Sequence, residues 1–214
     1  MNYDPNLHHR RSIRLKGYDY TQAGGYFVTI CTHRHECVLG KVVDGTMQLS
    51  PYGQIACDFW AEIPAHFPNV EAEPFVSMPN HVHVIIMIHE SRRGAVAAPL
   101  GGETPPVQDM EDGQAMRGET LPARDMGEGR VKGGETPPRY GLGQIVAYYK
   151  YQTTKRINAL RGSPGVPFWQ RNYYEHIIRN EAEWQNIWDY IQINPLRWEE
   201  DQLHPTAAPN RFNR

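Results

Sequence analysis

The alternation of apolar and polar positions predicts a buried central strand at residues 77–88. The segment is entered through a Pro-Asn pair and continues as a run of β-branched and other apolar residues, which is typical of a strand that follows a turn. Two imidazoles, His81 and His83, interrupt the start of this run. Residues i and i+2 of a strand point to the same face, roughly 6.6 Å apart. We therefore expect both imidazoles on one face and Val82 in the opposite layer.

The same kind of pattern predicts the elements on either side of this strand. Asp44 and Gly45 form a hairpin signal between two β-rich runs, and Ser50 followed by proline is typical of the start of a helix. Pro195 ends the last helical pattern. The first half of the chain thus predicts an antiparallel β-β-β-α-β-β arrangement with the helix on one face. The other predicted strands cover residues 26–32, 36–43 and 47–50, an aromatic strand or irregular stretch covers 168–178, and the later helices cover 143–160 and 181–194.

Residues 91–139 break these patterns. The sequence Gly-Glu-Thr-Pro-Pro, or a close variant of it, begins at positions 102, 118 and 134, at equal intervals. Such a segment, rich in Pro and Gly and poor in aliphatic residues, cannot bury a core. We expect a disordered insertion that lengthens a surface loop of one domain. That domain would cover residues 21–198, with a basic arm at 1–20 and a loose tail at 199–214.

Composition limits the classes of protein that fit. The chain has 214 residues, a net charge of −2 and three cysteines that form no Cys-x-x-Cys pair. One domain with reduced thiols, located in the cytoplasm, is therefore expected. No apolar run reaches the roughly 18 residues of a membrane span, and the polar, basic start of the chain is unlike a secretory signal. The near-neutral charge does not by itself indicate a nucleic-acid-binding protein.

Local charge is more informative, because the basic residues cluster. Between residues 148 and 180 the chain has six Lys or Arg residues and one Glu, and a second basic group lies within residues 1–20. Basic residues interleaved with aromatic side chains suit a phosphate backbone and unstacked bases, although a solvated helix face and a frayed terminus explain the same pattern. The candidate DNA-binding residues are Arg10, Arg11, Arg14, Lys16, Lys150, Lys155, Arg156, Arg171 and Tyr173.

The imidazole pair is a candidate metal site. Two neutral imidazoles on one strand face can converge on one divalent cation; half-buried histidines that bond to their neighbours are the alternative. On the last predicted helix, Tyr190 and Asn194 lie four residues apart and so share one face. If that helix packs beside the strand, the amide oxygen of Asn194 completes a nitrogen and oxygen donor set. Such a set accepts Mg²⁺ or Mn²⁺ and leaves positions open for water and phosphate oxygens.

Tyr190 would then be placed to act as a nucleophile. Its Oη would attack a phosphorus atom polarised by the cation, which gives a phosphotyrosine and a free 3′-hydroxyl. From the spacing alone, an ordinary interface tyrosine with an asparagine before proline is the simpler interpretation. Tyr148 and Gln152 form a second pair with the same spacing. We rank that pair second, because its helix precedes the aromatic block at 168–178.

Three blocks of the sequence together resemble a known family. They are Pro-Asn-His-Val-His-Val at 79–84, Phe-Trp-Gln-Arg-Asn-Tyr at 168–173 and Asp-Tyr-Ile-Gln-Ile-Asn-Pro-Leu-Arg at 189–197. In this order they are similar to the REP-associated tyrosine transposases, which belong to the single-tyrosine transposases of the His-hydrophobic-His (HUH) nuclease superfamily. The resemblance extends over about residues 10–198 and leaves the repeats outside it.

This resemblance implies a ferredoxin-like, RRM-like α/β (α+β) fold of the HUH endonuclease type, with an antiparallel sheet, helices on one face and the histidines on a central strand. It implies that His81 and His83 bind the cation, that Asn194 stands where insertion-sequence relatives have Gln, and that Tyr190 is the nucleophile. The implied function is a metal-dependent transposase or endonuclease. It would nick and rejoin single-stranded hairpin DNA of palindromic repeats through a 5′-phosphotyrosine, as a monomer or a homodimer.

Two other functions remain open from the sequence. A catalytically silent protein that binds hairpin DNA or RNA on the same fold would have the same basic surface. A metal-dependent phosphodiesterase that activates water would keep the histidines but would form no covalent adduct.

Overall fold

The chain is built around an antiparallel sheet of five strands. A computed structural model describes residue 15 and residues 17–72, 74–90 and 140–208. Within them, β4 (Val70–Glu71), β6 (His81–Ile88), β1 (Gly24–Cys31) and β7 (Tyr174–Ile178) lie in this order, and β5 (Phe75–Met78) also pairs with β6. The predicted insertion at 91–139 and most of the predicted N-terminal arm lie outside the described residues.

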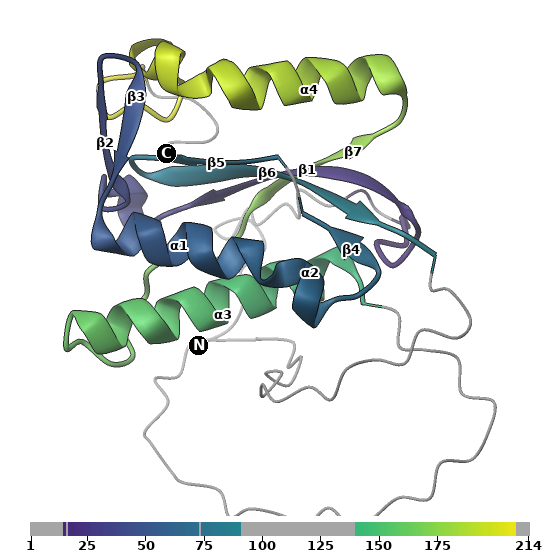
Figure 1. Ribbon diagram of the computed structural model, residues 1–214, viewed down its shortest axis with the longest axis horizontal. Coiled ribbons are helices and arrows are strands. Elements are labelled where there is room, and N and C mark those ends of the chain that lie inside the picture. The colour runs from purple at the N-terminus through teal and green to yellow at the C-terminus, as the bar shows by residue number, and fades with distance from the viewer. Residues whose placement is uncertain (1–14, 16, 73, 91–139, 209–214) are drawn as a thin grey trace, which may run out of the picture.

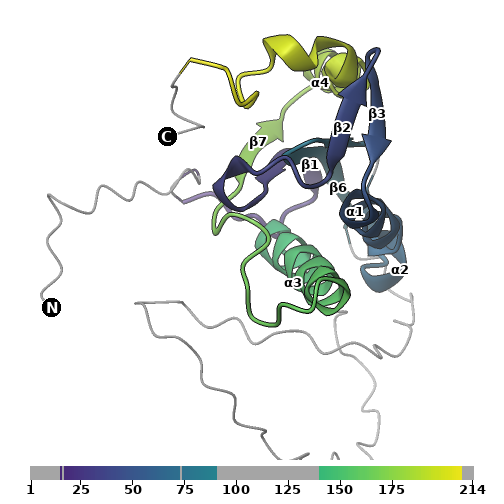
Figure 2. The ribbon, with the colours of Figure 1, turned by 90° about the vertical axis from the view of Figure 1, so that its left-hand side faces the viewer.

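Helices cover both faces of the sheet (Figures 1 and 2). The helices α1 (Pro51–Ala61), α2 (Ile63–His66) and α3 (Leu142–Leu160) lie on one face, and α4 (Glu181–Ile193) lies across the other. The predicted mixed fold with an antiparallel sheet is confirmed. The expected placement of all helices on one face differs from the structure at α4, because the face that carries the histidines is also apolar and needs cover. Ile85 on that face and Ile191 of α4 are both fully buried.

Residue alternation along β6 divides the core between the two faces. Val82, Val84 and Ile86 are fully buried and belong to the cluster that packs under α1 and α3, together with Tyr26 and Val28 of β1. His81 and His83 point the other way, as the two-residue period predicts. Because β6 has a strand on each side and helices above and below, all its residues except Met87 are buried.

The hairpin of β2 (Gly40–Val43) and β3 (Thr46–Leu49) forms a separate two-stranded sheet. Its first strand starts at Gly40, later than the predicted strand at 36–43. A short 3-10 turn, η1 (His33–His35), comes first, and the backbone that follows is bonded outside the hairpin: the N–H of Val38 donates to the carbonyl oxygen of Glu36, and that of Leu39 to Pro79. The predicted cap of α1 is present: Ser50 Oγ accepts hydrogen bonds from the backbone N–H groups of the first turn.

The chain beyond α4 folds back onto the sheet. A 3-10 segment, η2 (Asn194–Glu200), continues from α4, and Asp201 and Leu203 after it are buried. The carbonyl oxygen of Leu203 accepts a 2.8 Å hydrogen bond from Nδ2 of Asn80, just before β6. The described part of the predicted tail therefore forms one wall around the start of the histidine strand. None of the helices in the described part of the chain is both long and apolar enough to cross a membrane.

Candidate metal and nucleophile site

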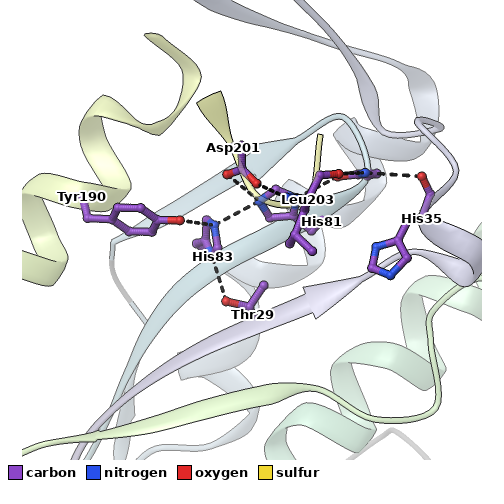
Figure 3. Close-up of polar contacts among 8 residues, drawn as sticks. Thr29, His35, His81, His83, Tyr190, Asp201 and Leu203 are labelled. Atoms are coloured by element: carbon purple, nitrogen blue, oxygen red, sulfur yellow. Dashed lines mark hydrogen bonds and ion pairs between the residues drawn. The ribbon is translucent and has the colours of Figure 1, made fainter. Parts of the chain in front are cut away.

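The two histidines converge at the start of β6 (Figure 3). His81 lies opposite Cys31 in the pairing with β1, and His83 lies opposite Thr29. Both side chains are buried, with relative exposures of 0% and 3%. Their Nε2 atoms are 3.0 Å apart. Adjacent donors of a six-coordinate cation with bonds of about 2.1 Å are separated by about 3 Å, so the pair is spaced as two neighbouring ligands would be.

Asn80 determines which nitrogen of His81 is available. Its amide Nδ2 donates to the carbonyl oxygens of Leu203 and His35, at 2.8 and 3.3 Å. Its Oδ1 therefore faces His81 Nδ1, at 2.8 Å. Because an amide oxygen only accepts, Nδ1 of His81 must carry the proton. The lone pair of Nε2 is then directed into the site, which is how an outer hydrogen bond prepares a histidine to bind a metal.

Thr29 gives His83 a different kind of support. Its Oγ1 lies 2.8 Å from Nδ1 of His83, and a hydroxyl can either donate or accept. Without a cation, Nε2–H of His83 can donate to Nε2 of His81 while Nδ1 accepts from Thr29. With a cation, the proton can lie on Nδ1 and be donated to Thr29, which frees Nε2 as a ligand. The site thus accommodates both states without moving either ring.

Burial keeps both imidazoles neutral. Desolvation lowers the pKa of His83 to about 3. Desolvation also lowers the pKa of His81 well below its usual value, and the neighbouring His83 and His35 act in the same direction. A metal ligand must be the deprotonated imidazole. Both side chains are therefore held in the form that a cation requires.

Tyr190 brings a phenol from α4 to the same point. Its Oη lies 3.3 Å from Nε2 of His83, and its ring packs edge-on against Phe27 at a centroid distance of 6.0 Å. The side chain is 37% exposed, so a substrate can reach it. Desolvation, followed by the charge of Asp201, raises the pKa of Tyr190 to about 12. The phenol is therefore protonated at neutral pH until a positive charge arrives nearby.

Asp201 is a member of the site that the sequence interpretation missed. Its Oδ2 lies 3.9 Å from Nε2 of His81, and one ligand atom from each of His81, His83 and Asp201 falls within 4.8 Å of the others. Burial raises the pKa of the Asp201 carboxyl, an effect that the hydrogen bond from the backbone N–H of Leu203 opposes. The only signal in the sequence is an acidic residue shortly after the last helix, within a run that resembles a solvated tail.

Asn194, the predicted third ligand, also lies at this site. It is 3% exposed, and among the described residues its Oδ1 atom has no hydrogen-bond partner. A buried amide oxygen without a partner is rare in proteins, and a cation would satisfy it. A cavity of about 250 Å³ opens here, lined by residues of α4 and η2 that include Tyr190, Asn194, Arg197 and Asp201. Nitrogen and oxygen donors without a thiolate suit Mg²⁺ or Mn²⁺ better than a structural zinc.

The predicted DNA-binding residues divide into three groups. Lys150, Lys155 and Arg171 line one cavity beside α3. Arg156 points elsewhere, with its guanidinium 5.7 Å from the ring of Phe59, and Tyr173 packs against the core. The remaining four, Arg10, Arg11, Arg14 and Lys16, lie outside the described residues.

The second tyrosine pair, Tyr148 and Gln152, is not brought to the histidines. The ring of Tyr148 stacks on His66 with a centroid distance of 3.8 Å, on the side of the sheet that α1 to α3 cover (Figure 1). Only Tyr190 of the two ranked candidates contacts His83.

No protein-family model matches the chain. It is 39% identical over 202 residues to an uncharacterized protein of Haemophilus influenzae, a match that covers 94% of this chain and 97% of that protein. The chain belongs to the same family as this Haemophilus protein. It also resembles the solved structure of a REP-associated tyrosine transposase bound to a REP hairpin, with a TM-score of 0.48 and 16% identity over 88% of this chain and 76% of the other.

Proposed function

We propose that the chain is a transposase-like enzyme that nicks and rejoins single-stranded hairpin DNA through a 5′-phosphotyrosine on Tyr190, with Mg²⁺ or Mn²⁺ as cofactor. One observation carries the proposal: the Tyr190 hydroxyl lies 3.3 Å from His83 Nε2, beside three buried side chains whose ligand atoms are close enough together to hold one metal ion. The motifs at 79–84, 168–173 and 189–197, which resemble those of REP-associated tyrosine transposases, support the same assignment.

The cation would be held by Nε2 of His81, Nε2 of His83 and a carboxylate oxygen of Asp201, with Oδ1 of Asn194 as a further donor. The carboxylate supplies a negative charge that two neutral imidazoles lack, which strengthens the hold on a hard cation. When bound, the cation would stabilise the phenolate of Tyr190 and polarise the scissile phosphate. The open side of the site leaves room for phosphate oxygens.

The reaction begins with transfer of the phenolic proton of Tyr190 to a solvent water, and solvent later supplies the proton that the leaving 3′-oxygen takes up. Its Oη then forms a bond to phosphorus as the bond from phosphorus to the 3′-oxygen of the neighbouring nucleotide breaks, and that oxygen takes up a proton. Phe27 packs against the tyrosine ring and keeps Oη directed at the site, so that little orientation is lost before attack. Attack by a 3′-hydroxyl on the phosphotyrosine reverses the step. One phosphodiester replaces another, so no nucleotide triphosphate is needed.

All of these groups come from one chain, which supports action in cis by a monomer. Tyr190 lies on α4 and the histidines on β6 of the same molecule. A homodimer that exchanged α4 between protomers would need to break this contact first.

Covalent trapping tests the proposal. A labelled single-stranded DNA hairpin with flanking single strands, incubated with the full chain and Mn²⁺, should give an adduct that survives denaturing electrophoresis. Tyr190→Phe should abolish it, and EDTA should prevent it. Tyr148→Phe is the matched control, because Tyr148 has the same local spacing but lies beside His66, and it should leave the adduct intact. Cleavage without an adduct would support a water-using phosphodiesterase, and binding without either would support a silent binder.

A further inference from the structure

A second cavity lies on the opposite side of the sheet from Tyr190. It has a volume of about 760 Å³ and is formed between the C-terminal half of α3 and the segment that follows, as far as Arg171; Figure 2 shows this segment looping beside α3. Ligand pockets commonly have volumes in this range. Three basic residues, Lys150, Lys155 and Arg171, are among its lining residues, and none of the lining residues is acidic.

The segment that follows α3 and forms one wall of the cavity is hydrogen-bonded to α3. Asn158 and Arg161, near the end of α3, both donate hydrogen bonds of 3.0 Å to the carbonyl oxygen of Val166. Farther along the segment, the indole N–H of Trp169 donates to Thr153 Oγ1 at 2.8 Å. These bonds fix the segment at two separate points of α3. The shape of the cavity is therefore set by these backbone and side-chain hydrogen bonds, and it does not depend on the placement of one exposed side chain.

The cavity combines an aromatic platform with positive charge. Tyr151 is 40% exposed, and Nζ of Lys155, one helical turn later, lies 6.0 Å from the centroid of its ring. Phe168 and Trp169 are buried and form an apolar floor. Nζ of Lys150 donates to the backbone carbonyl oxygens of Gln170 and Arg171.

The charge of the two lysines is not neutralised by carboxylates. Among the ion pairs of the described residues, none includes Lys150 or Lys155. Desolvation by burial lowers the pKa of Lys150 to about 8, although Cys31 acts in the opposite direction. A negatively charged ligand would compensate both groups. A ligand with a flat ring and an anionic group would stack on the aromatic ring of Tyr151 and pair with the lysines. A nucleotide has both parts, a base and a phosphate.

One lining residue of the cavity, Gln170, lies at the same end of the sheet as the candidate metal site. The backbone N–H of Gln170 donates to the carbonyl oxygen of Cys31 at 2.8 Å, and Cys31 is the register partner of His81. The side chain of Gln170 also bonds to Nε2 of His35 at 2.6 Å, and Asn80 bonds to the carbonyl oxygen of His35. Gln170, which lines the cavity, is therefore linked by hydrogen bonds to the end of the sheet where the histidines lie.

We propose that this cavity holds an unpaired base from a single-stranded segment next to the DNA hairpin. The base stacks on Tyr151, and the adjoining phosphates lie against Lys155 and Arg171. This inference rests on the proposed function, because it assumes that DNA is the substrate, but it assigns a separate site to the flank of the hairpin.

Binding without a cation tests the inference separately from chemistry. The full chain in EDTA is titrated with a DNA hairpin whose single-stranded flank carries 2-aminopurine at successive positions, because stacking on an aromatic ring quenches this base. One flank position should lose fluorescence. Tyr151→Ala should abolish that quenching and weaken binding about 5- to 150-fold, the effect of losing one base–aromatic stack. Tyr151→Phe should retain both. A hairpin without the flank should bind equally to all three proteins.

The charge contribution has its own control. Lys155→Ala should reduce the slope of log affinity against log salt for the flanked hairpin by about 0.7, the value for one phosphate contact on a single strand. Arg179→Ala removes the same charge near the opposite end of β1, where Gly25 pairs with Ile178, and should leave the slope unchanged.

The outcomes separate the two proposals. A covalent adduct on DNA together with unchanged flank binding in Tyr151→Ala would overturn the cavity assignment and leave the proposed function standing. Tyr151-dependent quenching without an adduct under any metal condition would support the cavity and contradict the nicking enzyme. An equal loss of affinity for hairpins with and without the flank would also overturn the assignment, because the cavity would then bind the duplex.

Discussion

Acid should destabilise the metal-free protein through the two buried imidazoles. His81 and His83 are neutral in the folded state, because desolvation lowers the pKa of each. In the unfolded chain each imidazole regains a pKa of about 6.5. Between the folded and unfolded pKa values, the unfolded state binds more protons than the folded state. The free energy of unfolding must therefore fall as the pH falls below about 6.5.

The structure gives the size of this effect. His83 has a pKa of about 3 when folded, so at about pH 5 it stays neutral while its unfolded counterpart is protonated. Each pH unit below the unfolded pKa costs about 1.4 kcal/mol, which amounts to about 2 kcal/mol at pH 5. His81 acts in the same direction. Asp201 acts in the opposite direction at lower pH, because burial raises its pKa and the folded state then binds its proton first.

Urea denaturation in EDTA at about pH 8 and pH 5, followed by tryptophan fluorescence, measures this dependence. In His83→Asn the difference in unfolding free energy between the two pH values should be smaller than in the unsubstituted protein by about 2 kcal/mol. Ser50→Ala is the control, because it removes the cap of α1 and no titratable group. It should lower the unfolding free energy equally at both pH values and so leave the difference unchanged. If His83→Asn and the unsubstituted protein lose the same stability on acidification, His83 is not held neutral and the reasoning is refuted.

Three further predictions follow from single contacts. Asp201→Asn keeps the shape of the side chain but removes its charge, and it should weaken Mn²⁺ binding, measured by calorimetry, at least 10- to 100-fold. An unchanged affinity would exclude the carboxylate as a ligand. Thr29→Val removes the hydroxyl that bonds to His83 and should weaken Mn²⁺ binding about tenfold, while the tyrosine adduct still forms at saturating metal. A loss of the adduct that excess Mn²⁺ does not restore would contradict this supporting role of Thr29. Ser50→Ala removes the cap of α1 and should lower the unfolding free energy, measured in urea, by about 1 kcal/mol without changing the affinity for Mn²⁺. A changed affinity would show that the helix cap and the metal site are not independent.

Local patterns in the sequence predicted the parts of the site that local geometry determines. The period of two placed His81 and His83 on one strand face, and the helical spacing placed Tyr190 and Asn194 on one helix face. That these faces meet was not evident from spacing, and an interface tyrosine was the simpler interpretation. The resemblance to a known family, read from three motifs, supplied the preference for Tyr190, whose hydroxyl lies 3.3 Å from His83 Nε2 in the structure.

The features that the sequence did not reveal depend on long-range packing. The amphipathic pattern of α4 shows that one side is buried, but it does not say which face of the sheet receives it. Asp201 follows two glutamates and resembles solvated chain; it becomes buried only because the segment after η2 returns to Asn80. The late start of β2 follows from a long-range contact, in which the N–H of Leu39 donates to the carbonyl oxygen of Pro79 instead of to a partner in the hairpin.

Mass spectrometry of the trapped adduct tests the central claim most directly. The tryptic fragment at 180–197 contains one tyrosine, Tyr190, whereas Tyr173 and Tyr174 fall in the preceding fragment. After reaction with hairpin DNA and Mn²⁺, followed by nuclease digestion, the account predicts a nucleotide linked through phosphate to Tyr190 and to no other residue. A nucleotide on any other side chain, or DNA cleaved in Mn²⁺ with the 180–197 fragment unmodified, would contradict it.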